Sequence, residues 1–115
     1  QYGLTHIDIV KVDAEGHDFD VIKGFHSAIE EGIIDMFQFE YNQFTLAARR
    51  ALRDFFKLFA ERYLICRLLP NGLEACGYHP VLENFGQSNW VAVRRGMIDA
   101  AAIRHFSISA AKGLP

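Results

Sequence analysis

The stretch from Ile7 to Asp18, which reads IDIVKVDAEGHD, decides the fold of this sequence. Its first six residues form an almost continuous apolar run rich in β-branched side chains. Such runs are typical of strands buried on both faces of a parallel sheet. Gly16 interrupts the run, and Asp18 is expected to cap a helix whose apolar face reaches Phe25. The stretch therefore predicts a strand, a tight turn and a helix in succession.

Four more strands are predicted along the rest of the chain. Residues 33–41, IIDMFQFEY, are expected to form the second strand, and residues 63–69 the third. A turn signal, Pro-Asn-Gly at residues 70–72, predicts that residues 73–78 return as a short antiparallel strand. Residues 89–93 are predicted to form the last strand.

Helical patterns separate these strands. Residues 26–32 are predicted to form a short helical turn and a loop, and Thr45 is expected to cap the longest helix, over residues 46–62. The alternation predicts an α/β fold with a mostly parallel sheet and an antiparallel closing hairpin. We expect residues 1–96 to form this unit and residues 97–115 to form a tail with helical character.

The composition is that of a soluble globular protein. At 115 residues the chain has room for one domain, and half of its residues are hydrophobic. A formal net charge of −2 offers no broad basic surface, so nucleic acid is not an expected partner. No apolar run approaches the length of a membrane span. A cytoplasmic location is expected, because the sequence has two cysteines and no signal-peptide pattern.

Cys66 and Cys76 are equidistant from Asn71, at the centre of the predicted turn. With a three-residue loop the two cysteines would face each other across the hairpin, and with a two-residue Asn-Gly turn they would be diagonal. A disulfide is therefore feasible, but two reduced and partly buried thiols are expected in a reducing compartment.

Polar residues cluster where two predicted strands end. An open α/β sheet binds ligands beyond the carboxyl ends of its strands, which directs attention to residues 13–17 and 40–42. Lys11 and Asp13 share a face of the first strand, roughly 6.6 Å apart. A carboxylate such as Asp13 or Glu15 could orient a hydroxyl and accept its proton. Acidic residues and glycine are also ordinary in strand-to-helix turns, so a purely structural role stays open.

Glu40 ends the second strand in the same way, and the acidic ends of neighbouring strands would converge on one crevice. There they could bind a divalent cation or the hydroxyls of a substrate, or Glu40 could form a salt bridge with Lys11 or Arg49. His17, at the start of the predicted helix, is a further candidate. The acidic run does not fit an EF-hand, and the histidine spacing predicts no zinc site. The sequence has no glycine-rich phosphate loop and no G-x-S-x-G motif.

These segments resemble the hallmark segments of the FkbM-type methyltransferases. In that family a strand of the pattern Ile-Asp-hydrophobic-hydrophobic-Lys-Ile-Asp-x-Glu-Gly leads into a helix that ends in Leu-x-Gly. Residues 7–16 and then residues 21–24, VIKG, are similar to this pattern. Later segments resemble the family's next strand, hairpin and closing strand, in that order: residues 37–41, 63–72 and 88–92. Asp18 stands where the family usually has Glu.

The resemblance implies a Rossmann-like class I methyltransferase that uses S-adenosylmethionine and methylates a hydroxyl on a sugar, polyketide or other small molecule. It implies the C-terminal half of that fold, with the main cofactor-binding loop outside this chain. Asp13 is then expected to lie near the methyl donor and the acceptor, as orienting group or base, and Glu15 to be a second catalytic residue. Glu40 and Asn42 are expected at the acceptor site. His17 stays a substrate-binding candidate on its place in the chain alone, and a requirement for a divalent metal is left open.

Two other interpretations stay open. The chain could be a non-catalytic α/β module for binding or assembly, whose long amphipathic helix and first strand pair with a partner. It could also be another Rossmann-like enzyme that acts on a nucleotide or sugar phosphate, which the Lys-x-Asp-x-Glu-Gly segment disfavours. The first strand is expected at a sheet edge, an arrangement that invites homo-oligomerisation.

Overall fold

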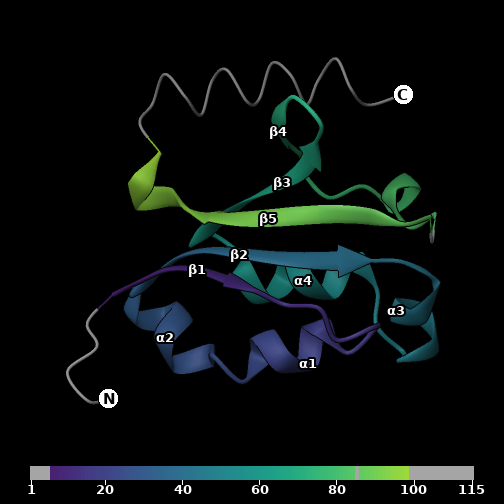
Figure 1. Ribbon diagram of the computed structural model, residues 1–115, viewed down its shortest axis with the longest axis horizontal. Helices are drawn as coiled ribbons and strands as arrows, with labels where there is room; N and C mark the ends of the chain where they lie inside the picture. The colour runs from purple at the N-terminus through teal and green to yellow at the C-terminus, as the bar shows by residue number, and fades with distance from the viewer. Residues whose placement is uncertain (1–5, 85, 99–115) are drawn as a thin grey trace.

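A mixed sheet of five strands organises the part of the chain that the computed structural model describes, residues 6–84 and 86–98 (Figure 1). The strand order is β1-β2-β5-β3-β4. The strands are Ile7–Lys11 (β1), Ile34–Tyr41 (β2), Tyr63–Leu69 (β3), Gly72–Ala75 (β4) and Ser88–Arg94 (β5). The predicted α/β fold is confirmed, and the predicted bounds of β1, β2, β3 and β5 are correct to within one residue. Only β4 is much shorter than predicted.

The strand pairing differs from the predicted mostly parallel sheet. Strands β1 and β2 are parallel, whereas the β2–β5, β5–β3 and β3–β4 pairs are antiparallel. The prediction is wrong because β5, the last strand in sequence, is inserted between β2 and β3. Because β2 and β3 are both antiparallel to β5, strands β1, β2 and β3 run in the same direction. Their carboxyl ends therefore meet at one edge of the sheet.

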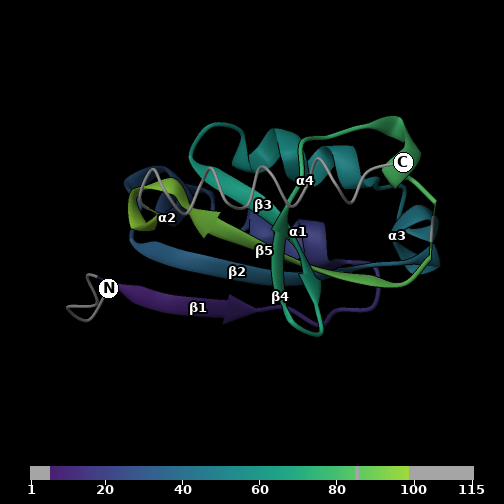
Figure 2. The same ribbon diagram turned by 90° about the horizontal axis from the view of Figure 1, so that it is seen from above.

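Four helices connect the strands in the described residues. They are Asp18–Lys23 (α1), His26–Glu31 (α2), Gln43–Ala47 (α3) and Leu52–Phe59 (α4). Two short 3₁₀ turns, Pro80–Leu82 and Arg95–Met97, flank β5. Helices α1, α2 and α4 lie on the same side of the sheet (Figure 2). None of the described helices has the length and apolar character that crossing a membrane requires.

The predicted single helix over residues 46–62 is in fact two helices. Asn42 caps α3 by accepting a hydrogen bond from the backbone N–H of Phe44 (2.8 Å), while the Thr45 hydroxyl accepts one from the backbone N–H of Asn42 (3.1 Å). Thr45 is therefore the third residue of the helix and not its cap. Arg49 then adopts a positive φ of 60°, which the α-helix does not allow, and the helix has to begin again.

A carboxylate from a distant part of the chain caps the start of the second helix, α4. Glu83 accepts hydrogen bonds from the backbone N–H groups of Leu52 and Arg53, both at 2.9 Å. The first N–H groups of a helix have no partner within the helix, so an acceptor at this place fixes where it starts. Glu83 lies about thirty residues further along the chain, and local helical periodicity carries no sign of it.

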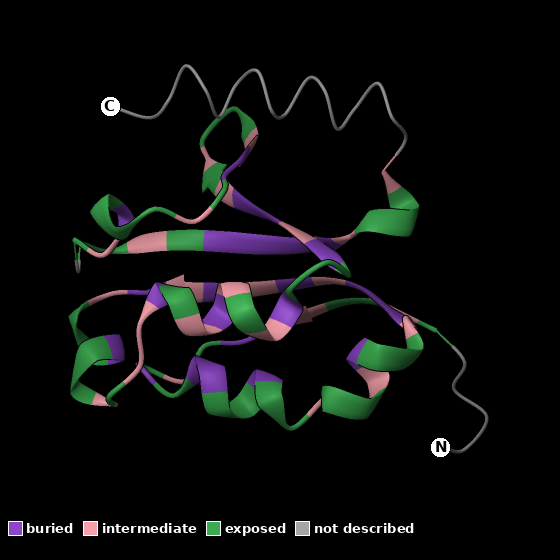
Figure 3. Ribbon diagram, turned by 180° about the vertical axis from the view of Figure 1, so that it is seen from behind, coloured by how far each residue is buried: buried purple, intermediate pink, exposed green. Residues whose placement is uncertain are grey.

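Aromatic side chains form the core between the sheet and α4. Phe39 of β2 stacks on Phe55 of α4, with ring centroids 4.1 Å apart, and Phe37 packs against Phe59 at 5.3 Å. Phe19 of α1 meets Phe55 edge to face. The buried residues line the inner faces of the sheet and helices, and the outer faces of the helices are exposed (Figure 3). The aromatic side chains that α4 presents to the sheet, Phe55 and Phe59, are therefore part of the core.

Strand β1 lies at the edge of the sheet, as predicted, but it is not buried on both faces. The side chain of Ile9 is 48% exposed. Among the described residues β1 has a neighbouring strand on one side only, and this edge position leaves its side chains less covered than those of β2. The expectation of burial on both faces is therefore wrong for this strand.

The hairpin of β3 and β4 places the two cysteines on neighbouring strands. A two-residue loop, Pro70 and Asn71, joins the strands, and Cys66 pairs in register with Ala75. The loop is therefore neither the three-residue loop nor the Asn-Gly turn that were considered, and Cys76 lies one residue beyond the position opposite Cys66. Both cysteines are free and buried. The predicted tail lies outside the described residues from residue 99 onward.

Candidate functional site at the carboxyl edge of the sheet

A pocket of about 220 Å³ opens where β1 and β2 end. Its polar lining comes from three adjacent strands or their ends: Lys11, Asp13, Gln38, Glu40 and Asn89. The predicted convergence of Asp13 and Glu40 on one crevice is therefore found.

The strand register explains why these side chains meet. Lys11 lies beside Gln38 in the parallel pair, and Glu40 lies opposite Asn89 in the antiparallel pair. Alternate residues of a strand point to the same face, so Glu40 and Gln38 share the face opposite to Phe39 and the helices. The aromatic core thus packs against one face of the sheet, while the polar side chains Gln38 and Glu40 lie on the opposite face and line the pocket.

A buried carboxylate ties the two strand ends together. Asp18, only 2% exposed, accepts a hydrogen bond from the backbone N–H of Ala14 at 2.8 Å and another from that of Glu40 at 2.9 Å. The expectation that Asp18 caps α1 is wrong: the N-cap residue is His17, and the Asp18 side chain points to the sheet edge instead. Because one rigid group holds both backbones, it fixes the spacing between the Asp13 turn and Glu40.

The turn after Asp13 is held from its other side by α3. Gly16 has a φ of +98°, and a Cβ atom at this position would overlap the backbone carbonyl of Phe44. Only glycine combines that conformation with so close an approach. Glu15, directly before it, also has a positive φ, of 45°. The turn is therefore clamped between α3 and the Asp18 carboxylate.

Glu40 is anchored by the segment that precedes β5. Its carboxylate accepts a hydrogen bond from the Gln87 side-chain amide at 2.6 Å. Neither of the two salt bridges considered for Glu40, to Lys11 or to Arg49, is formed in the described part of the chain. The carboxylate keeps a free oxygen lone pair toward the pocket, because a single amide donor does not saturate it.

The other predicted residues lie around this pocket but not in it. Asn42 caps α3 and lines a neighbouring pocket of about 210 Å³ together with Gln87. Glu15 and His17 are exposed and line neither pocket. The structure thus brings Asp13 and Glu40 together, places Asn42 next to them, and leaves Glu15 and His17 outside. The roles of all five residues stay predictions.

One group of metal-capable side chains lies at the opposite end of β1 and β2. The His6 Nε2 atom is 2.7 Å from Asp35 and 3.0 Å from Asp8. The Asp35 carboxylate also accepts hydrogen bonds from Nε and Nη2 of Arg94, at 3.2 and 2.9 Å. Since the guanidinium already neutralises Asp35, this group is best described as an ion-pair network that fastens β1 to β2.

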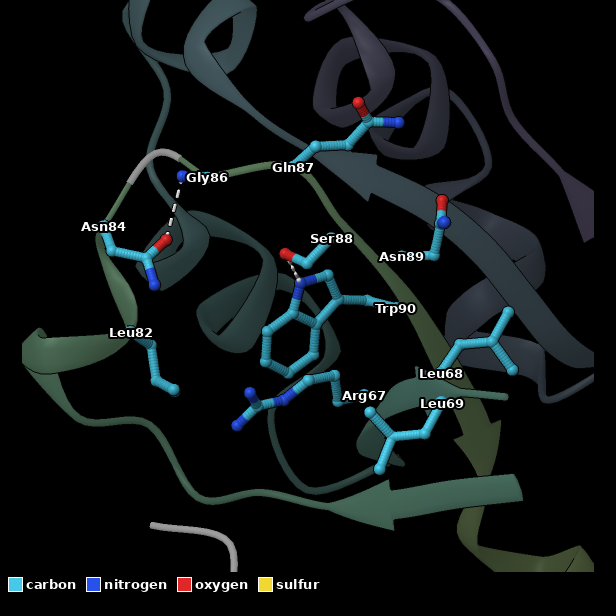
Figure 4. A pocket seen from close by; sticks show the side chains of 10 residues that line it. All are labelled: Arg67, Leu68, Leu69, Leu82, Asn84, Gly86, Gln87, Ser88, Asn89 and Trp90. Carbon is cyan, nitrogen blue, oxygen red and sulfur yellow. Dashed lines mark hydrogen bonds between the residues drawn. The ribbon is translucent and has the colours of Figure 1, made fainter. Parts of the chain in front are cut away.

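A larger pocket of about 370 Å³ lies beside the first one along the same edge (Figure 4). It is enclosed by the end of β3, the start of β5 and the residues before β5, and Asn89 lines both pockets. Local sequence patterns do not predict this pocket, because it forms only when β5 is inserted beside β3. The polar run Gln87-Ser88-Asn89 before an apolar strand was the only signal of it.

Comparison with known protein families gives a match over most of the chain. Residues 1–80 match the family described as the methyltransferase FkbM domain. The match covers more than two thirds of the chain and includes Asp13, Glu15, Glu40 and Asn42, whereas β5 lies beyond it. No curated protein and no solved structure matches the chain.

Proposed function

The chain belongs to the FkbM methyltransferase family, and from this premise we propose that it is part of an S-adenosylmethionine-dependent enzyme that methylates a hydroxyl of a sugar, polyketide or other small molecule. The observation that carries the proposal is the pocket in which Asp13 and Glu40 meet. The pocket lies at the carboxyl ends of β1 and β2, where open α/β sheets bind their ligands.

The residues present fit the cofactor. S-adenosylmethionine supplies a methyl group activated on a positively charged sulfonium, and the pocket, with two carboxylates and one lysine, has a net negative charge that suits a cationic ligand. Asp13, which is exposed at the pocket, would hold the cofactor from this side. In the proposed arrangement Glu40 would bind the acceptor, because it has oxygen lone pairs free for a hydroxyl donor.

In the proposed mechanism Asp13 acts on the acceptor hydroxyl. Its carboxylate would accept a hydrogen bond from the hydroxyl and so aim the oxygen lone pair at the methyl carbon. As the new carbon–oxygen bond forms and the carbon–sulfur bond breaks, Asp13 would receive the hydroxyl proton. Proximity and alignment of the reactants would supply much of the rate enhancement. The hydrogen bonds of Asp18 to the backbones of Ala14 and Glu40 would contribute by holding the two strand ends at a fixed spacing.

The test is transfer of labelled methyl from S-adenosylmethionine to candidate alcohols by the complete protein that contains this chain. Asp13→Asn removes the base and keeps the side-chain size, and should lower kcat by about 10²-fold or more. Asp8→Asn, at the other end of β1, is the matched control, since its side chain is exposed and pairs only with His6 in the described residues. Equal activity of the two variants would remove Asp13 from the mechanism.

A second candidate function, a non-catalytic assembly module, is favoured by the open edge of β1. An unpaired strand edge can pair with another chain, and Ile9 is exposed beside it. This alternative predicts that association depends on β1 and that no alcohol is methylated. Sedimentation of wild type and an Ile9→Lys variant distinguishes the two, because a catalytic role of the pocket does not require association through β1.

A further inference from the structure

The larger pocket beside the candidate site contains a cation whose bonding is incomplete. Arg67, from the end of β3, runs alongside the indole ring of Trp90 in Figure 4, with its guanidinium carbon 5.7 Å from the ring centroid. Its Nε atom is buried and has no hydrogen-bond partner, and it is the one such side-chain atom in the described residues. A buried donor without an acceptor carries its full desolvation cost.

The neighbours of Arg67 within the protein do not complete its bonding. Its Nη2 atom lies 3.7 Å from a Glu74 oxygen, beyond hydrogen-bond length, and 4.0 Å from the Cys76 sulfur, a weak acceptor. A guanidinium has five N–H donors in a planar fork, an arrangement that matches the oxygens of a carboxylate or phosphate. The structure therefore leaves Arg67 with donors available for an anionic group.

The rest of the pocket is consistent with such a group. The described residues that line it include no acidic side chain, and three of them are amides: Asn84, Gln87 and Asn89. Two of the amides are already engaged within the protein, because the Asn84 oxygen accepts from the Gly86 N–H at 2.9 Å and Gln87 donates to Glu40. Arg67 is thus the dominant charge that a ligand in this pocket would meet.

Arg67 and Glu40 lie on opposite faces of the sheet. Arg67 pairs in register with Trp90, and Trp90 with Phe39, so these residues share the face that packs against α4. Glu40 pairs with Asn89 on the other face, although Asn89 lines both pockets. The site at Arg67 is therefore distinct from the pocket in which Asp13 and Glu40 meet.

We propose that the larger pocket binds a carboxylate or phosphate group through Arg67. This anion site does not rest on the proposed function.

Three probes with one carbon skeleton test the anion site in the 115-residue chain: glucose, glucuronate and glucose 6-phosphate. Their binding is followed by NMR through the Nε–H signal of Arg67, without a methyl donor. We expect at least one charged probe to bind about tenfold or more tightly than glucose, the scale of a hydrogen bond to a charged group. Preference for glucuronate indicates a carboxylate, and preference for the phosphate ester indicates a phosphate.

Variants separate recognition by Arg67 from general effects on folding. Arg67→Gln should abolish the preference for the charged probe, whereas Glu74→Gln should increase it, because the nearest competing carboxylate charge is removed. A merely structural role of the Arg67–Glu74 pair would not give effects of opposite sign. Arg50→Gln, which breaks the exposed ion pair of Arg50 with Asp20, is the control and should leave the preference for the charged probe unchanged.

Equal binding of charged and neutral probes, binding of none of them, or a weaker preference in Glu74→Gln would overturn the anion site. Failure of the proposed function has a different signature: the charged probe still binds through Arg67, but no labelled methyl reaches any alcohol, anionic or neutral. Methylation of neutral alcohols without a preference at Arg67 would remove this inference alone.

Discussion

Replacing Asp18 should destabilise the chain far more than replacing its neighbour Asp20. Asp18→Ala leaves the backbone N–H groups of Ala14 and Glu40 without their acceptor in a partly buried place. Each such loss costs about 1–3 kcal/mol, so the variant should lose about 2–6 kcal/mol of unfolding free energy. Asp18→Asn keeps one acceptor oxygen and should lose about half as much.

Asp20→Asn is a closely matched control, because Asp20 lies two residues further on in the same helix turn. Its carboxylate is half exposed and pairs with Arg50 at the surface, so the loss should stay below about 1 kcal/mol. Urea unfolding followed by the fluorescence of Trp90, the single tryptophan and 2% exposed, measures all three variants. If Asp18→Ala costs no more than Asp20→Asn, the buried tie between the strand ends does not stabilise the fold as argued.

Three further predictions concern other parts of the structure. Gly16→Ala should cost at least about 1–3 kcal/mol through backbone strain at a positive φ and overlap with Phe44, whereas Gly77→Ala, where a Cβ meets open space, should be close to neutral in the same urea assay. Burial raises the pKa of Glu83, but hydrogen bonds from the Leu52 and Arg53 N–H groups and the Tyr78 hydroxyl outweigh burial and hold the pKa below its ordinary value of 4.5. The stability that this lowered pKa contributes is present above pH 4.5 and is lost as the pH falls through the folded-state value. Glu83→Gln should therefore make the unfolding free energy less dependent on pH in this acidic range. An unchanged pH dependence would contradict the role given to Glu83. Burial, reinforced by the neighbouring Cys76, raises the pKa of the Cys66 thiol from 9.0 to about 12. The unfolded chain therefore ionises first, and stability should fall by up to about 1.4 kcal/mol per pH unit as the pH rises from 9 toward 12, a slope that Cys66→Ala should reduce.

Local pattern was sufficient for the strands and for part of the site. The β-branched and aromatic runs that became β1, β2 and β3 fixed their bounds to within one residue, because strand patterning and turn residues are local signals. Two acidic strand ends also indicated the pocket that holds Asp13 and Glu40, since parallel strands bring their carboxyl ends to one edge.

What the sequence could not show depends on residues far apart in the chain. The start of α4 is set by Glu83, the spacing of the pocket by Asp18, and the larger pocket by the insertion of β5 beside β3. The sequence predicts a cap at Asp18 because an acidic residue at the start of a helix is often one. Nothing local distinguishes that role from a bond to a strand end twenty-two residues away.

Under the proposed function, methyl transfer takes place at the shared carboxyl edge of β1 and β2. Amide chemical-shift mapping of the complete protein with S-adenosylhomocysteine, the product form of the cofactor, tests this location. We predict that the largest shifts within this chain fall on the residues of the smaller pocket, around Asp13 and Glu40. Shifts confined to α2 or to the outer hairpin of β3 and β4, with none at the carboxyl edge, would contradict the account.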